Sequence, residues 1–495
     1  MNLEYVLKFG ILLLKIVCLL YGLKYVFKVI YVAYIGPLSK IPGPKIGFLT
    51  KLYMDIRQMK GQRWKWLHYE ILPKYGRVVR VAPRVIVIAD KDILKQILVT
   101  NELPKNKNYD KLRVDENYST LFTTRDLAFH KARRRVLSPV FSMKQISSLE
   151  SLMGTCCQDL TDKIDEMITL NDSKDAVVDI YNLINLNALD TIGETSFGGS
   201  FKLVKYGSHP LPGKMFKEFR RRVLKSMFPV FGQFSKVDPY LVDFTKEIIK
   251  QRRQSATTRK DLLQALLDAK DSNGNGLSDF EIFDQCFEFL LAGSDSTSFT
   301  TSITLIELIR RPEVYRKLVE ELDKVISKYD SNKRLIPPYD ILKNLPYLDA
   351  VINEGLRLYP SSRDLGPGKE AVEDMVIGDY SIPKGTVLTA NIFAVHHSKE
   401  YWGENSYEFV PERWLNPENI PVDGFIPFLA GSRNCIGQNF ARMELKLTIP
   451  ALVLKYEFED IPGQDNEILQ FLTTSLRGKS HNVIARHRIK NDLIS

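Results

Sequence analysis

The cysteine at position 435 stands in a loop, FLAGSRNCIG, that favours its thiolate form. Gly431 and Gly437 allow turns and close backbone approach on both sides of Cys435. Arg433 supplies a fixed positive charge, and Phe428 supplies an aromatic wall. The residues that follow, QNFARMEL, read as the start of a helix, whose N–H groups stabilise anionic sulfur. A buried cysteine that only packs is the alternative, but the glycines on either side indicate a thiolate with a chemical role.

A second run, FEFLLAGSDST, places an acid and hydroxyl groups in the middle of an apolar helix. Asp295, Ser296 and Thr297 are poor choices for a helix that only packs. Hydroxyl side chains can bond to freed backbone carbonyls and bend a helix locally. The run therefore predicts a helix with polar groups at a local bend, and a cap or kink with no other role is the alternative.

Charged residues in two later segments are spaced so that they could pair. Glu354 and Arg357 are three positions apart on a predicted helix within residues 344–360, so they share a face. Arg413 follows in the segment FVPERW, ahead of the cysteine loop. Most such pairs are solvated surface bridges, so the spacing alone does not decide between a surface pair and a buried one.

Together these segments resemble, in the same order along nearly the whole chain, the cytochrome P-450 haem-thiolate monooxygenases, and they look most like ascomycete fungal members. The resemblance implies that Cys435 is the axial ligand of the iron of haem b and pushes electron density toward O–O cleavage. It implies a proton relay through Asp295 and an alcohol, with Ser296 where threonine is usual and Thr297 directly after it.

The resemblance also assigns structural and cofactor-holding roles. The acid and the two arginines of the paired segments would form a buried lock, which is costly to break because each charge depends on the others. Arg433, Arg134 and His130 would bond to the haem propionates. Phe428 and Gly437 would contact the cofactor from the cysteine loop. The remaining basic residues of the segment HKARRR form either a solvated face or a docking face for an acidic reductase, and both interpretations stay open.

The composition, 44% hydrophobic and 26% charged over 495 residues, is ordinary for a globular protein. No internal repeat or Gly/Ser linker follows residue 50, so we expect one large domain. The implied fold is mainly α with small β-sheets. The net charge of +10 lies mostly at the two ends of the chain, which fits a membrane surface and argues against nucleic-acid binding. Five cysteines without paired spacing suggest neither a disulfide framework nor a zinc site, and indicate a reducing compartment.

Residues 1–35 are predicted to form a membrane anchor helix, 36–45 a proline-rich hinge, and 46–495 the catalytic domain. Lys8 and Lys15 fall on one side of the predicted helix and Lys24 and Lys28 on the other, so the helix lacks the single polar face of one that lies flat. We therefore expect a single-pass anchor in the endoplasmic reticulum with a cytosolic body, and an interfacial or re-entrant helix is the alternative.

The implied reaction inserts one atom of O2 into an apolar or aromatic substrate. Since the chain carries no flavin or nicotinamide fingerprint, the electrons would come from a separate NADPH–cytochrome P-450 reductase, and cytochrome b5 stays open as a second donor. Two alternatives are a haem-thiolate enzyme that rearranges peroxides and a catalytically silent membrane haem protein. The sequence does not identify the substrate.

Overall fold

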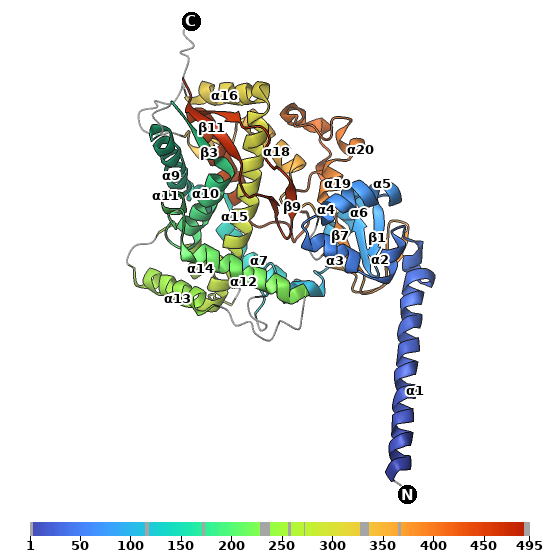
Figure 1. Ribbon diagram of the computed structural model, residues 1–495. Helices are drawn as coiled ribbons and strands as arrows, with labels where there is room; N and C mark the ends of the chain where they lie inside the picture. Colours follow the sequence, from blue (N-terminus) through green and yellow to red (C-terminus); the bar gives the residue numbers. More distant parts are fainter. Residues whose placement is uncertain are drawn as a thin grey trace.

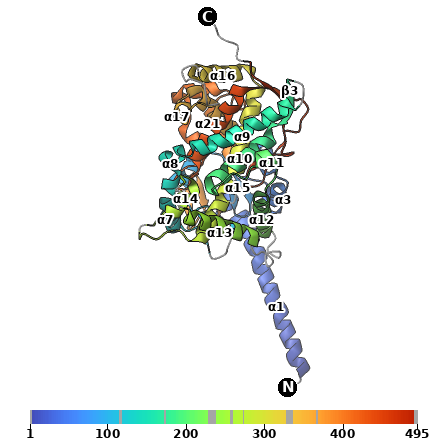
Figure 2. The ribbon, with the colours of Figure 1, turned by 90° about the vertical axis from the view of Figure 1, so that its left-hand side faces the viewer.

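The computed structural model describes residues 3–113, 118–170, 174–227, 238–255, 259–271, 273–326, 336–364 and 368–489. It shows a mainly helical body with small β-sheets and one long helix that points away from it (Figure 1 and Figure 2). This is the fold class that the sequence predicts.

The longer helices of the body are α7 (Leu127–Leu137), α9 (Glu150–Thr169), α10 (Ile180–Ser196), α12 (Pro210–Met227), α13 (Pro239–Gln254), α15 (Asp279–Ile309), α16 (Pro312–Ile326), α18 (Pro346–Leu358) and α21 (Gln438–Lys455). The shorter ones are α2 (Lys45–Leu49), α3 (Leu52–Met59), α4 (Arg63–Lys65), α5 (Leu72–Tyr75), α6 (Lys91–Lys95), α8 (Met143–Ser147), α11 (Leu203–Tyr206), α14 (Leu262–Asp268), α17 (Tyr339–Leu342), α19 (Ile392–His396) and α20 (Lys399–Trp402).

Small sheets join distant parts of the sequence. The largest has the strand order β1 (Val78–Ala82), β2 (Val85–Ile88), β7 (Val387–Ala390) and β4 (Lys369–Glu370). Its β2 and β7 run parallel, which brings the first and last thirds of the body together. A second sheet has the order β3 (Asp175–Asp179), β11 (Asn482–His487) and β8 (Tyr456–Asp460). Two antiparallel hairpins are β5 (Met375–Ile377) with β6 (Tyr380–Ile382) and β9 (Ile468–Gln470) with β10 (Thr474–Leu476).

Helix α15 crosses the centre of the body and is buried along most of its 31 residues (Figure 1). It begins at a capping box, in which the Ser278 N–H donates to Glu281 Oε2 at 2.8 Å and the Glu281 N–H donates to Ser278 Oγ at 3.3 Å. Helix α18 packs closely on it because Gly355 has no side chain, since a Cβ there would lie 2.1 Å from Thr304 Oγ1. The apolar core around α15, α18 and α21 thus fixes the elements that carry the candidate residues.

The helix that points away in Figure 1 is α1 (Leu3–Ile30). Large apolar side chains along it, such as Leu14, Leu19 and Phe27, are exposed. The segment Lys8–Lys40 is long and apolar enough to cross a membrane by length and composition alone. Its base is tied to the body by Arg80, a fully buried arginine of β1. The guanidinium donates to the carbonyls of Val32 at 2.8 Å and of Ala33 and Leu38 at 3.2 Å. After the helix, a 3-10 turn at Pro37–Lys40 continues into the body.

Candidate active site

The cysteine loop is pinned by its backbone in front of α21, which begins at Gln438, where the sequence predicts a helix to start. The Cys435 N–H donates to the carbonyl of Phe428 at 2.8 Å. Gly431 has φ +77°, and a Cβ at this position would lie 2.1 Å from the carbonyl oxygen of Leu98. Only glycine permits this contact, which places the loop against the helical turn Gln96–Thr100 that follows α6.

The thiol of Cys435 lies inside the protein but is not covered by it. Its side chain is exposed, yet the surrounding protein raises the pKa of the thiol, while the Gly437 N–H and the charge of Arg134 favour the thiolate. The sulfur is therefore accessible although protein atoms closely surround it. Among the described residues, no group of three or more His, Cys, Asp or Glu could hold a metal ion. A single thiolate suits a metal whose other ligands come with a cofactor.

One face of α15 is less buried than the rest of the helix. Glu288, Leu291, Ala292, Asp295 and Ser296 are only partly buried or exposed, although their neighbours along the helix are mostly buried. Their spacing of three and four residues places them on one side of the helix. This stripe includes the acid and the first alcohol of the predicted relay.

Hydroxyl side chains bond to backbone carbonyls one turn earlier, as the sequence predicts. Ser294 Oγ donates to the Leu290 carbonyl at 2.5 Å, and Ser296 Oγ donates to the Ala292 carbonyl at 2.6 Å. Thr297 differs, because its Oγ1 is buried and has no hydrogen-bond partner within the described part of the chain. The two candidate alcohols therefore lie in different places: Ser296 is on the partly exposed stripe, and Thr297 is 3% exposed.

The carboxyl of Asp295 is held from outside the helix. Its Oδ2 accepts a hydrogen bond from Thr473 Oγ1 at 3.4 Å. Burial raises the pKa of Asp295, and the charge of Lys479 and the Thr473 hydroxyl oppose this effect. An acid in such surroundings can hold a proton or release it at moderate cost, as proton transfer requires.

Basic side chains crowd the region next to the cysteine loop, and we call them the cationic cluster because four of the five are lysine or arginine. Burial lowers the pKa of Lys105 to about 7, of Lys369 to about 8 and of His130 to about 3, and the positive charge of Arg433 is the second cause in each case. Burial also lowers the pKa of Arg433, whose Nε is buried without a hydrogen-bond partner among the described residues. Arg134 completes the group, and its guanidinium donates to Asn434 O at 2.5 Å and Oδ1 at 2.6 Å.

This cationic cluster is a natural place for an anionic ligand, because bound carboxylates would relieve both the repulsion and the loss of water. The structure brings together the three groups that the sequence assigns to the propionates, Arg433, Arg134 and His130. It adds Lys105 and Lys369, which sequence reasoning missed. Lys369 lies on β4 and Lys105 in a loop bridged to it, so no local spacing could have revealed them.

Lys105 also connects the cationic cluster to α15. Its charge interacts with Glu288 on the partly exposed stripe as well as with Arg433 in the cysteine loop. The cationic cluster therefore interacts both with the cysteine loop and with the stripe on α15. The donor set of one thiolate and several buried cations fits haem, whose iron needs an axial ligand and whose propionates need positive partners.

The predicted lock is assembled. Glu354 Oε2 accepts from Arg357 Nε at 2.8 Å and from Trp414 Nε1 at 2.9 Å. Its Oε1 accepts from Arg413 Nε at 3.0 Å and from the Val410 N–H at 2.9 Å. The side chains of Glu354 and Arg357 are 0% exposed. This rules out the solvated surface pair that the sequence left open.

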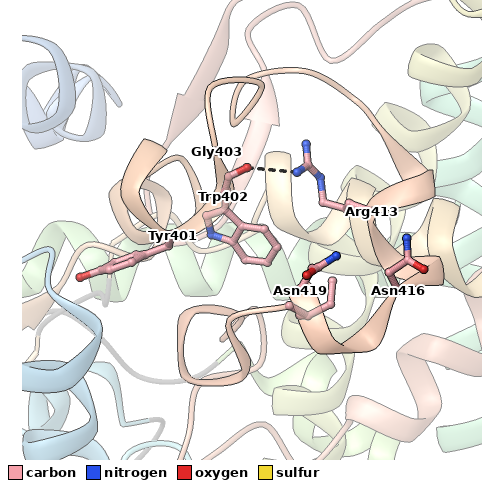
Figure 3. A pocket seen from close by; sticks show the side chains of 7 residues that line it. Tyr401, Trp402, Gly403, Arg413, Asn416 and Asn419 are labelled. Carbon is pink, nitrogen blue, oxygen red and sulfur yellow. Dashed lines mark hydrogen bonds between the residues drawn. The ribbon is translucent and has the colours of Figure 1, made fainter.

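A small pocket of about 290 Å³ reaches the outer side of Arg413 (Figure 3). Its walls include Tyr401, Trp402, Asn416 and Asn419, and Arg413 Nη1 donates to the Trp402 carbonyl at 3.2 Å. Arg413 is 13% exposed as a result. It is the member of the lock that solvent can reach.

Comparisons with known proteins agree with this geometry. The family model for cytochrome P450 matches residues 41–483. The cytochrome P450 monooxygenase LUC2 of Fusarium sp is 34% identical over 472 residues, covering 94% of this chain and 91% of that protein. FUS8 of Gibberella moniliformis, also a cytochrome P450 monooxygenase, is 32% identical over 92% of this chain and 89% of its own length. Benzoate 4-monooxygenase of Aspergillus niger is 30% identical over 85% of this chain and 88% of its own length.

Proposed function

Since the chain belongs to the cytochrome P450 family and is a haem-thiolate monooxygenase, we propose that it hydroxylates an apolar or aromatic substrate with electrons from a separate NADPH-dependent reductase. The balanced reaction is RH + O2 + NADPH + H+ → ROH + H2O + NADP+. The observation that carries the proposal is the enclosed but uncovered Cys435 thiol beside the cationic cluster.

Haem b, when bound, supplies the redox iron whose thiolate ligand promotes O–O cleavage. Cys435 is the ligand in this proposal, and Phe428 and Gly437 shape the loop that presents it. Arg433, Arg134, His130, Lys105 and Lys369 hold the propionates by charge-assisted hydrogen bonds, which are stronger than neutral ones.

Asp295 and Ser296 move protons in this proposal. Asp295 lies on the partly exposed stripe, where burial shifts its pKa toward the protonated form, as a group that takes up and passes on a proton requires. Ser296 shares that stripe, and its Oγ can exchange the Ala292 carbonyl for another proton acceptor on the same face of the helix. Thr297 is buried away from the stripe, which favours Ser296 as the relay alcohol.

The lock of Glu354, Arg357 and Arg413 is structural in this proposal and keeps the segment before the cysteine loop in place. Helix α1 is the membrane anchor, the segment 36–45 the hinge, and the body is cytosolic on the endoplasmic reticulum. The exposed apolar side chains of α1 and the attachment of its base by Arg80 support this arrangement. Resistance of the protein to extraction from microsomes by alkaline carbonate tests it, and release would contradict it.

Reconstitution tests the reaction. The full-length protein, a fungal NADPH–cytochrome P-450 reductase and 18O2 are incubated with a panel that includes benzoate, cinnamate, dodecanoic acid and ergosterol. One labelled oxygen in a product, dependent on NADPH and reductase, is expected for at least one panel member. Conversion of an added fatty-acid hydroperoxide without NADPH would instead show the peroxide-rearranging alternative. Haem binding without turnover of any kind would favour a silent haem protein. Cytochrome b5 is added as a separate arm.

A further inference from the structure

A hydrogen bond connects the acid of α15 to a hairpin near the C-terminus. Thr473 lies in the turn between β9 and β10, and its Oγ1 donates to Asp295 Oδ2 at 3.4 Å. The two residues are 178 positions apart in the chain. Neither needs the other for secondary structure, because the helix continues on both sides of Asp295.

The body fixes the hairpin that carries Thr473. The next residue, Thr474, donates from its N–H to the Ser361 carbonyl at 3.0 Å and from its Oγ1 to the same carbonyl at 2.8 Å. The Leu476 N–H donates to the hydroxyl of Tyr181 on α10 at 3.3 Å. The backbone that follows Thr473 is thus anchored to the body, as the support of a group that orients another must be.

The polar and charged groups that act on the Asp295 carboxyl come from three elements. Thr473 comes from the β9–β10 turn, Lys479 from the turn before β11, and Tyr181 from α10. Thr473 and Lys479 favour the ionised carboxyl and oppose the effect of burial. Tyr181 bonds to the hairpin backbone, and burial raises its own pKa to about 12, so it stays neutral.

We propose that Thr473 is the positioning residue of the proton relay, in which its hydroxyl orients the Asp295 carboxyl and the β9–β10 turn thereby controls proton delivery. This inference rests on the role proposed for Asp295. Thr473 itself touches no reacting atom and acts through the acid. A long hydrogen bond of 3.4 Å can be exchanged at low cost, which lets the carboxyl turn from the hairpin toward Ser296 on the same stripe.

Two variants of Thr473 separate the hydroxyl from the shape of the side chain. Thr473→Val keeps the branched shape and removes the hydroxyl, and Thr473→Ser keeps the hydroxyl and removes a methyl group. The ferric, full-length holoproteins are titrated by infrared difference spectroscopy, and the Asp295 carboxyl band is identified by its loss in Asp295→Asn. This readout needs no substrate and no turnover.

We expect the Asp295 pKa to rise by roughly 0.4 in Thr473→Val, because a hydrogen bond to the ionised form, at the weak end of the usual range, is lost. Thr473→Ser should restore the wild-type value. An unchanged pKa in Thr473→Val would overturn the inference. Equal shifts in both variants would overturn it as well, since packing of the methyl group would then explain them.

A second readout connects the shift to catalysis and separates this inference from the proposed function. NADPH oxidation by the reconstituted enzyme is followed against pH with dodecanoic acid as the apolar probe. The inflection in the rate of NADPH oxidation against pH should shift in Thr473→Val in the same direction as the Asp295 pKa measured by infrared spectroscopy. It should return to its wild-type position in Thr473→Ser. An inflection that persists in Asp295→Asn would show that the relay assignment itself is wrong, while the infrared titration still decides whether Thr473 orients the acid.

Discussion

Replacing Glu354 by alanine tests how much of the protein depends on one buried carboxylate. The change removes the acceptor of four donors, which are Arg357, Arg413, the Val410 N–H and the Trp414 indole. It leaves two guanidinium groups without their carboxylate. Breaking a buried pair in this way costs about 3–5 kcal/mol, a large share of a total stability of about 5–15 kcal/mol.

The assay is urea unfolding of the purified protein, together with the ratio of haem to protein after expression. We expect Glu354→Ala to unfold at a clearly lower urea concentration and to yield little holoprotein. Arg413→Ala should be milder, because Arg413 is 13% exposed and solvent from the pocket can hydrate the site. Glu404→Ala is the matched control, since Glu404 is 86% exposed and its pair with Lys399 should contribute less than about 1 kcal/mol. Normal haem content and stability in Glu354→Ala would refute the structural role of the lock.

Three further predictions follow from particular contacts. Lys369→Gln should lose haem to apomyoglobin about tenfold faster or more, because a charge-assisted bond to an anion is worth about 1.5–3 kcal/mol; a wild-type rate would remove Lys369 from the propionate site. Gly431→Ala should take up little haem, since a Cβ would clash with the Leu98 carbonyl. Gly478→Ala is the control and should behave as wild type, because no atom lies within 4 Å of the added Cβ. Equal haem content in the two variants would contradict the contact at Gly431. Deletion of residues 1–30 should release the protein from membranes and leave its stability intact. Deletion of residues 1–35 should lower the free energy of unfolding in urea by about 1–3 kcal/mol, because Arg80 loses the Val32 and Ala33 carbonyls. Equal urea midpoints for the two deletion variants would contradict this.

Local spacing predicted those parts of the site whose geometry is local. The turns around Cys435, the helix after it and the shared face of Glu354 and Arg357 all depend on neighbours a few positions away. The hydroxyl bonds within α15 are of the same kind, because each joins residues four apart. Spacing does not predict the pairing with Arg413, which the resemblance to the P-450 family implies, and the structure brings the three side chains together.

The parts that the sequence did not reveal arise from contacts between distant segments. Lys369 reaches the cationic cluster through β4, whose pairing with β7 has no signal in its own two residues. Thr473 meets Asp295 only because the β9–β10 hairpin is held against α15. Arg80 attaches the base of α1 through carbonyl groups, which any residue type supplies. Each of these side chains or strands contacts either a backbone atom, which any residue type supplies, or a residue far away in the sequence. No pattern within one segment could therefore identify the contact.

The most direct test is the carbon monoxide difference spectrum of the reduced, full-length protein, recorded beside Cys435→Ser. The thiolate assignment predicts a strongly red-shifted Soret band for the wild type and its loss in Cys435→Ser. A haem-loaded wild type without that band, or a variant that keeps it, would show that Cys435 is not the ligand.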